Sequence, residues 1–226
     1  MAKHTRLDIT GYQDKPVPNE FVQPRGSNNR LAIMLPGFAY TCDMPLFYYA
    51  EELFIQTGVD ILRVEYAYHK VPGWLKLPGD EPDRWLAADV TAAYRAAIGL
   101  RPYRELILIG KSIGTMAMAH LLTMPDRFAG NARAVWLTPA FGLPNLTGLM
   151  TRCPDPSLIV IGDADHHYDT AALDTLRATT KPEVLVISGA DHSLDLAGDV
   201  GGSILALRQT MQAVERFLAS PVAASG

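Results

Sequence analysis

Short apolar runs alternate along the chain with longer segments in which apolar positions recur at the spacing of a helix. The runs are apolar throughout, which is typical of strands whose two faces are both covered. They predict strands over residues 31–35, 59–66, 106–109, 134–137, 158–161 and 184–187. The periodic segments predict helices over residues 45–56, 83–98, 113–122, 171–178 and 202–218. Because strands and helices alternate, we expect parallel βαβ units and therefore an α/β fold, with a mostly parallel central sheet and helices on both faces.

Three stretches fall outside this alternation. The first 25 residues or so, and Arg6–Phe21 in particular, fit an antiparallel hairpin at the sheet edge. The small-residue segment 220–226 predicts a flexible tail. The segment Thr138–Ser157 is too short for a cap domain and has room only for a loop or a single helix. We therefore expect residues 1–226 to form a single domain with no separate cap.

Composition narrows the class of protein. The chain has 226 residues, of which 48% are hydrophobic, so it can bury a sizeable core. Its formal net charge is −4 and Lys and Arg are not clustered, which argues against nucleic acid as a partner. No apolar run is long enough for a membrane span, and no signal peptide is recognisable at the start. We expect a cytoplasmic protein that does not bind membranes, and a homo-oligomer is left open.

The stretch ELILIGKSIGTMAMAHLL offers two chemistries, a phosphate-binding loop and a nucleophile elbow. A phosphate loop needs a glycine five positions before Gly110, where Glu105 stands, and the residues at 106–109 predict a strand instead of a loop. The elbow pattern G-x-S-x-G needs a serine between a strand and a helix, flanked by glycines, and Ser112 lies between Gly110 and Gly114 in that setting. The elbow is favoured over a serine that only caps the helix.

A serine nucleophile requires a histidine base and an acid that orients it. Parallel strands place such residues at their carboxyl ends, and two later strands end in suitable loops. Asp163 and Asp165 follow the fifth predicted strand, and His192 follows the sixth. The chain therefore carries the order serine, acid and histidine that this type of site requires.

Four motifs at these strand ends resemble those of the α/β-hydrolase family. They are LPGF after the first strand, GKSIG at the elbow, GDAD after the fifth strand and GADHS after the sixth. The resemblance covers nearly the whole chain and implies the α/β-hydrolase fold, in a small, capless serine hydrolase of the esterase or thioesterase type. In such members the acid lies in a G-x-x-D turn, which corresponds to Asp165, with Asp163 as the alternative acid. The family's histidine corresponds to His192.

The resemblance also implies an oxyanion hole. Its two backbone N–H donors correspond to Phe38 and Ile113, the residue after the nucleophile. This chain has Pro36 where many relatives have histidine, which preserves the donor and changes the contacts that support it. Lys111 stands at the variable position of the elbow, and we expect its side chain to be directed away from the site.

Aromatic and apolar residues near these loops are candidate pocket walls. Tyr40, Met44 and Phe47 follow the oxyanion turn, and Trp74 and Leu75 lie in the loop after the second strand. For each of them an ordinary place in the core or on the surface is an equally good interpretation. Together they favour an apolar or aromatic acyl group as the substrate.

The remaining histidines and acids suggest less. His4 and His69 lie away from the predicted strand ends, and His120 falls within a helix. A metal site would draw on a group of loop residues, but adjacent side chains seldom converge, and we expect no metal and no cofactor. That group consists of Asp163, Asp165, His166, His167 and Asp169.

The sequence therefore predicts a serine hydrolase that cleaves a carboxylic ester or thioester of a small-molecule acyl substrate. Two alternatives remain open. One is an enzyme of the same fold that cleaves a C–C or peptide bond, and the other is a non-catalytic binding protein with the hydrolase fold.

Overall fold

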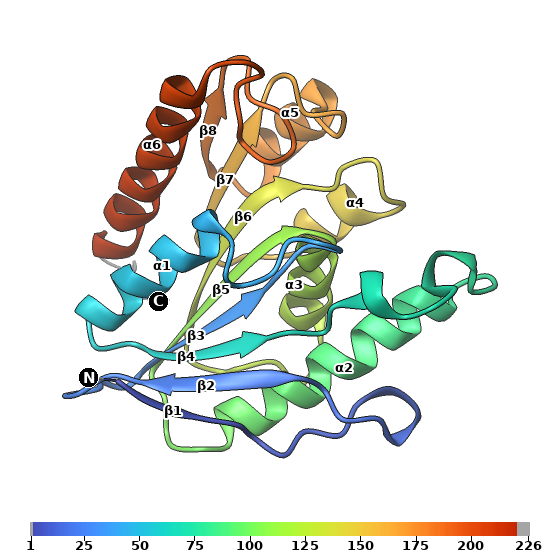
Figure 1. Cartoon of the computed structure of the whole chain (residues 1–226), viewed down its shortest axis with the longest axis vertical. Helices are drawn as coiled ribbons and strands as arrows, with labels where there is room; N and C mark the ends of the chain where they lie inside the picture. Colours follow the sequence, from blue (N-terminus) through green and yellow to red (C-terminus); the bar gives the residue numbers. More distant parts are fainter. Residues whose placement is uncertain (1, 221–226) are drawn as a thin grey trace.

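The computed structural model describes residues 2–220, apart from the side chain of Leu75. One eight-stranded sheet runs through the molecule (Figure 1). Its strands are β1 (Lys3–Thr5), β2 (Asn19–Gln23), β3 (Arg30–Leu35), β4 (Asp60–Val64), β5 (Glu105–Ser112), β6 (Asn131–Pro139), β7 (Ser157–Gly162) and β8 (Glu183–Ile187). They lie in the order β1-β2-β4-β3-β5-β6-β7-β8. The pairings of β2 with β1 and β4 are antiparallel and all others are parallel, so the predicted sheet type is confirmed.

Within residues 2–220 there are six α-helices, five between strands and one after β8. They are α1 (Pro45–Gln56), α2 (Glu81–Ile98), α3 (Ile113–Thr123), α4 (Leu146–Met150), α5 (Thr170–Thr179) and α6 (Val200–Ala219). Short 3-10 turns lie in the connections: η1 (Tyr12–Asp14), η2 (Tyr68–Lys70) and η3 (Trp74–Lys76). Every predicted strand and helix is present, and α4 is the single short helix that the length of its segment allowed. None of the helices within residues 2–220 is long and apolar enough to cross a membrane.

The N-terminal region forms the antiparallel edge of the sheet, but the hairpin expected over Arg6–Phe21 is wrong in its extent. β1 already ends at Thr5 and β2 begins at Asn19, so most of that range is the connection between them. Within that connection Thr10 and Pro16 form an isolated antiparallel bridge, next to which the Val17 N–H donates to the Ile9 carbonyl at 2.8 Å. Pro16 and Pro18 have no N–H to donate, so this pairing does not extend into a continuous ladder. The predicted flexible tail lies outside the described residues beyond position 220.

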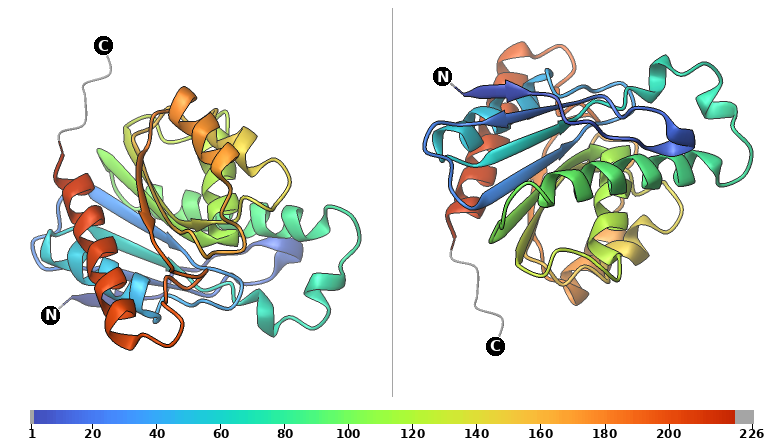
Figure 2. Two further views of the ribbon diagram at one scale, coloured as in Figure 1. Left: turned by 90° about the horizontal axis from the view of Figure 1, so that it is seen from above. Right: turned by 90° about the horizontal axis from the view of Figure 1, so that it is seen from below.

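Side chains of the central strands alternate between two helical layers. In β5, Leu106 and Leu108 pack in the core shared with α2, α3, α4 and α5, whereas Ile107 and Ile109 pack in the core shared with α1 and α6. Figure 2 shows α1 and α6 together on one side of the sheet and α2 and α3 on the other. Both faces are covered, which explains why the strand is apolar throughout. Lys111 follows Ile109 by two positions, so its side chain starts toward the layer of α1 and α6.

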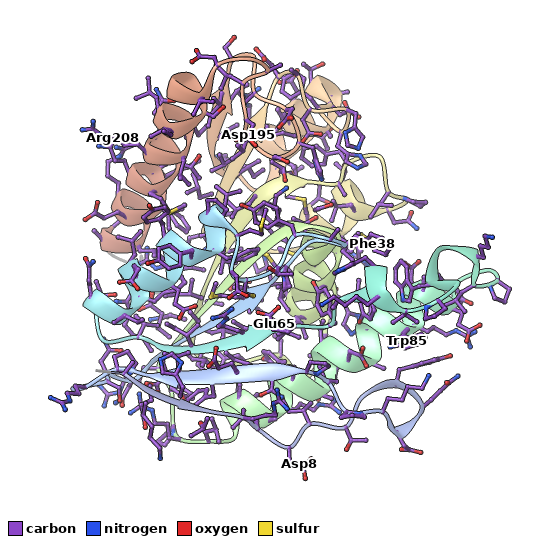
Figure 3. All side chains as sticks on the ribbon, viewed as in Figure 1. Asp8, Phe38, Glu65, Trp85, Asp195 and Arg208 are labelled. Carbon is purple, nitrogen blue, oxygen red and sulfur yellow. The ribbon has the colours of Figure 1, made fainter. Side chains whose placement is uncertain are left out.

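The carboxyl ends of the parallel strands meet at one edge of the sheet, and the predicted site residues lie there. Ser112 is the last residue of β5, Asp165 lies in the loop after β7, and His192 lies in the loop after β8. Figure 3 shows Phe38 on the turn after β3 and Asp195 on the loop after β8. The topology therefore gathers four segments that are distant in sequence.

Candidate active site

Ser112 occupies a sharp turn between β5 and α3. Its φ of 54° and ψ of −120° are rare for a residue other than glycine and cost about 1–3 kcal/mol. A Cβ placed on Gly110 would lie 2.6 Å from the carbonyl oxygen of Gly114, and one on Gly114 would lie 1.9 Å from that of Leu35. Packing thus requires glycine at both positions. The Ser112 side chain makes no capping hydrogen bond to α3, so helix capping does not explain this serine.

His192 and Asp165 form a hydrogen-bonded pair between the loops after β8 and β7. Nδ1 of His192 lies 2.8 Å from Oδ2 of Asp165, whose side chain is fully buried. Oδ1 of Asp165 accepts a hydrogen bond from the His167 N–H at 2.8 Å. Burial alone raises the pKa of Asp165, but these hydrogen bonds and the charges of the two rings bring the pKa below its ordinary value. Within residues 2–220, no hydrogen bond joins Ser112 Oγ to the His192 ring.

Asp163, the alternative acid, has a different set of partners. Its Oδ1 accepts a hydrogen bond from the Gly189 N–H at 2.6 Å, and its Oδ2 accepts one from the Ser188 hydroxyl at 3.1 Å. These contacts close the turn at the end of β8. The structure therefore brings Asp165 to His192 and uses Asp163 to hold the loop that carries this histidine.

The Lys111 side chain contacts the loop that carries His192, contrary to our expectation that it is directed away from the site. The residue is only 2% exposed. Its Nζ donates hydrogen bonds to Thr138 Oγ1 at 2.8 Å and to the His192 carbonyl oxygen at 2.6 Å, and it lies 4.8 Å from the centre of the Tyr40 ring. Among the ion pairs of residues 2–220, none involves Lys111. Burial lowers the pKa of Lys111 to about 8.

The turn after β3 lies directly against Ser112. A Cβ placed on Gly37 would lie 3.4 Å from Ser112 Cβ, so the backbone of the turn approaches the serine closely. The Phe38 carbonyl oxygen lies 2.9 Å from Nδ1 of His69, so His69, which we expected far from the strand ends, supports this turn. Among the described residues, the N–H groups of Phe38 and Ile113 have no hydrogen-bond partner. Both residues are partly exposed.

Aromatic rings from the connection after β4 support the same turn. Tyr66 and Tyr68 stack with their centroids 4.6 Å apart, and Tyr68 and Trp74 stack at 4.9 Å. The Phe38 ring packs against Trp74 at 5.4 Å. The Tyr66 hydroxyl donates a hydrogen bond to the Pro36 carbonyl. These contacts hold the turn that contains Pro36 and Phe38.

Asp89 of α2 joins this aromatic stack to the N-terminal region. Its Oδ2 accepts a hydrogen bond from the Tyr68 hydroxyl at 2.9 Å, and its Oδ1 accepts one from the Tyr12 N–H at 2.8 Å. The carboxyl is buried, and burial raises its pKa. A continuous chain of contacts therefore runs from the connection between β1 and β2 to the turn after β3.

Tyr40 and Met44, two of the predicted pocket residues, line a cavity of about 640 Å³. It lies between the start of α1, the loop after β8 and the first turns of α6. Its apolar lining includes Leu46, Leu194 and Leu196. Among the described residues, neither the serine nor the histidine–aspartate pair lines it. The cavity is thus a neighbour of the site and does not contain it.

The other predicted pocket residues are less exposed. Trp74 is buried against Phe38, next to the turn after β3. Phe47 is wrong as a pocket wall because it is fully buried in the core between α1 and the sheet. The side chain of Leu75 lies outside the described residues.

Three histidines gather at the mouth of the site. The ring centroids of His166 and His167 are 4.2 Å apart, and they lie 4.9 Å and 5.1 Å from that of His192. Nδ1 of His167 accepts a hydrogen bond from the Gly142 N–H at 3.3 Å. Adjacency in sequence to the acid was the only signal for these two side chains.

The remaining candidates have structural partners. His120 lies 3.0 Å from the Thr91 hydroxyl between α3 and α2, and His4 pairs with Glu20 at the sheet edge. Asp169 caps α5 by accepting hydrogen bonds from its first N–H groups. These residues lie outside the site.

No protein-family model and no curated protein matches the chain. Solved structures do match. An esterase from Pyrococcus furiosus superposes with a TM-score of 0.71 at 16% identity, over 96% of this chain and 92% of that one. An esterase from Butyrivibrio proteoclasticus with ferulic acid bound gives 0.67 at 15%, over 94% and 99%, and an α/β serine hydrolase homologue from Coxiella burnetii gives 0.66 at 17%, over 95% and 97%. The chain therefore has the α/β-hydrolase fold.

Proposed function

We propose that the protein is a serine hydrolase that cleaves carboxylic esters or thioesters through an acyl-enzyme intermediate. The observation that carries this proposal is the 2.8 Å pair of His192 and Asp165, which stands at the same sheet edge as the strained turn of Ser112. A turn with this strained backbone conformation presents the serine hydroxyl above the sheet. Hydrolysis makes use of all three groups.

In this mechanism Ser112 Oγ attacks the acyl carbonyl while Nε2 of His192 takes its proton. The imidazolium then returns the proton to the leaving alcohol or thiol, and the acyl group stays on Ser112. Water, deprotonated by the same histidine, releases the acid in the second half. The ionised Asp165 fixes Nδ1 as the donor and stabilises the imidazolium. The hydrogen bond from Ser112 Oγ to Nε2 of His192 is expected to form when substrate binds, since such hydrogen bonds are often long in free enzymes.

The oxyanion is held by the N–H groups of Phe38 and Ile113. Each donor of this kind is typically worth about 2.7–4 kcal/mol of barrier. The close approach of Gly37 to Ser112 and the aromatic support beneath Phe38 favour a rigid turn. A preorganised donor needs this rigidity, because it must not reorient during the reaction.

The substrate is expected to be a small molecule with an apolar or aromatic acyl group. Phe38 and Trp74 supply an aromatic wall beside the oxyanion turn. The segment with α4 is too short to form a cap, so the site is open on that side. Among the similar structures, the Butyrivibrio proteoclasticus esterase carries ferulic acid, which makes aromatic esters a reasonable first test.

A fluorophosphonate probe tests the nucleophile. We expect the wild-type protein to be labelled and the Ser112→Ala variant to remain unlabelled. Labelling of the Ser112→Ala variant contradicts the proposal. So does a folded wild-type protein that is not labelled, and this result would favour a non-catalytic binding protein.

Two matched variants test the acid. Asp165→Asn removes the charge that faces His192, and we expect kcat to fall by about 10⁴-fold, as in other triads. Asp163→Asn changes a carboxylate two positions away that holds a turn, and we expect kcat within about tenfold of wild type. The opposite order of the two effects would assign the role to Asp163.

A substrate panel tests the reaction class. Acyl esters and thioesters of graded chain length, an aromatic ester, an aminopeptidase substrate and a diketone are compared by kcat/KM. Preference for an ester or thioester supports the proposal. Preference for the peptide or the diketone assigns the same groups to peptide or C–C cleavage.

A further inference from the structure

Asp165 faces a second histidine in addition to His192. Nδ1 of His166 lies 3.6 Å from Oδ1 of Asp165, while Nδ1 of His192 lies 2.8 Å from Oδ2. Asp165, His166 and His192 each offer one ligand atom, and these three atoms all lie within 4.8 Å of one another. Two imidazoles thus flank the two oxygens of one buried carboxylate.

This donor set suits a borderline divalent cation such as Zn²⁺. Zinc binds histidine nitrogen and carboxylate oxygen at about 2.0–2.2 Å in a tetrahedral arrangement. Ligand atoms at that radius are separated by roughly 3.3 Å. His192 Nδ1 lies 2.8 Å from one Asp165 oxygen and His166 Nδ1 lies 3.6 Å from the other, so each ring nitrogen is near this separation from a carboxylate oxygen. His166 is the most exposed of the three, with 69% of its side chain accessible, so it can move the remaining distance at low cost.

The neighbouring groups are already engaged elsewhere. Nδ1 of His167 accepts the Gly142 N–H, Asp163 holds the turn after β8, and Asp169 caps α5. Adjacent side chains on one loop seldom converge on a metal ion. Here the third ligand comes from another loop, because Asp165 and His166 of the loop after β7 meet His192 of the loop after β8.

We propose that Asp165, His166 and His192 bind a zinc ion that reversibly inhibits the enzyme, with water as the fourth ligand. Zinc takes the place of the proton on His192 Nδ1, and the neutral imidazole then carries its proton on Nε2. The bound ion removes the carboxylate from its orienting role, and a protonated Nε2 cannot take the proton of Ser112 Oγ. The inhibitory part of the inference rests on the proposed function, whereas the binding site does not.

Calorimetric titration tests the site separately from catalysis. Zinc chloride is added to the Ser112→Ala protein in a buffer that does not chelate metals, and we expect one ion to bind per chain. Loss of an outer-shell partner of a metal typically weakens binding 10- to 100-fold, so loss of a direct ligand should cost at least about tenfold. We therefore expect His166→Gln in the same background to weaken binding by that factor or more.

His167→Gln is the matched control, because it removes an adjacent ring that is not a ligand. We expect it to bind zinc within about threefold of its parent, and magnesium, which prefers oxygen ligands, to bind to none of these proteins. Absence of zinc binding, or equal binding with and without His166, overturns the site.

Ester hydrolysis then tests inhibition. Each Ser112-containing protein is first assayed in EDTA, and zinc inhibition is expressed relative to that rate. We expect wild type and His167→Gln to be inhibited over the concentrations at which zinc binds, and His166→Gln to need at least about tenfold more zinc. Equal inhibition of wild type and His166→Gln overturns the inhibitory role. Zinc binding without any hydrolysis by wild type contradicts the proposed function and leaves the site intact.

Discussion

Replacing Lys111 by Met tests whether the buried lysine positions His192, the proposed base. Methionine has a similar length and fits an apolar environment, but it cannot donate a hydrogen bond. The change removes the bonds of 2.8 Å to Thr138 and 2.6 Å to the His192 carbonyl while leaving Ser112 and its flanking glycines in place. Lys111 is expected to act through His192, without touching the substrate.

The expected magnitude follows from these two contacts. A hydrogen bond to a charged group contributes about 1.5–3 kcal/mol. Removal of a buried, unpaired charge relieves a desolvation penalty of comparable size. The free energy of unfolding should therefore change by less than about 2 kcal/mol near neutral pH. Catalysis has no such compensation, because a displacement of about 1 Å at a reacting group costs on the order of 100-fold.

The assay is steady-state hydrolysis of the best ester of the panel. We expect kcat of Lys111→Met to fall about 100-fold and KM to stay close to that of wild type. Thr138→Val is the matched control, since it removes the other acceptor of the lysine and keeps the bond to His192. A Lys111→Met variant with wild-type kcat, or a Thr138→Val variant that is equally impaired, would refute the positioning role.

The pH dependence of stability gives a second measurement on the same pair of proteins. Burial lowers the pKa of Lys111 from its ordinary 10.5 to about 8. The penalty for burying the charge is therefore fully present below pH 8 and is relieved as the pH rises from 8 toward 10. Over this window the stability of wild type relative to Lys111→Met should increase by on the order of 3 kcal/mol. Urea unfolding at successive pH values measures it, and a flat or falling difference contradicts the buried charge.

Three further comparisons of stability test the framework of the site. Gly114→Ala places a Cβ 1.9 Å from the Leu35 carbonyl oxygen, and we expect a loss of at least about 3 kcal/mol in thermal unfolding; a near-neutral effect would contradict the close packing. Ser112→Gly should be more stable than Ser112→Ala by about 1 kcal/mol, because glycine relieves the strain at φ 54°. Since the pKa of Asp165 is lowered in the folded protein, its ionised form stabilises the fold above the ordinary carboxyl pKa, and this contribution is lost as the pH falls through the lowered value. The stability advantage of wild type over Asp165→Asn should therefore shrink in acid, and a growing advantage would contradict this assignment.

The parts of the fold and site that were predictable depend on local pattern and on topology. The apolar run before Ser112 and the small residues after it identify a strand and a helix, and the two glycines identify the turn between them. Parallel strands end at one edge, so Asp165 and His192 could be expected near Ser112 without knowledge of any distance. These inferences need only the order of elements along the chain.

The contacts that were missed join residues distant in sequence through the conformations of loops. Lys111 and His192 are 81 positions apart, and no periodicity in the sequence predicts that a lysine in the elbow donates a hydrogen bond to the His192 carbonyl. His69 reaches the Phe38 carbonyl from a 3-10 turn that propensity does not identify. The extent of the hairpin was wrong because Pro16 and Pro18, which cannot donate an N–H to a continuous ladder, were not weighed.

The chain of contacts through Asp89 has a consequence for how the protein can be shortened. Tyr12 contributes no catalytic group, yet its N–H holds the carboxylate that binds Tyr68 beneath the oxyanion turn. A truncated protein that begins at position 18 would retain Ser112, Asp165 and His192, the proposed triad, and lose the Tyr12 contact that supports the turn after β3. Such a fragment should still react with a fluorophosphonate while it turns over esters slowly. If the proposed function holds, the smallest fully active fragment therefore includes the N-terminal edge of the sheet, which contributes no residue to the proposed triad.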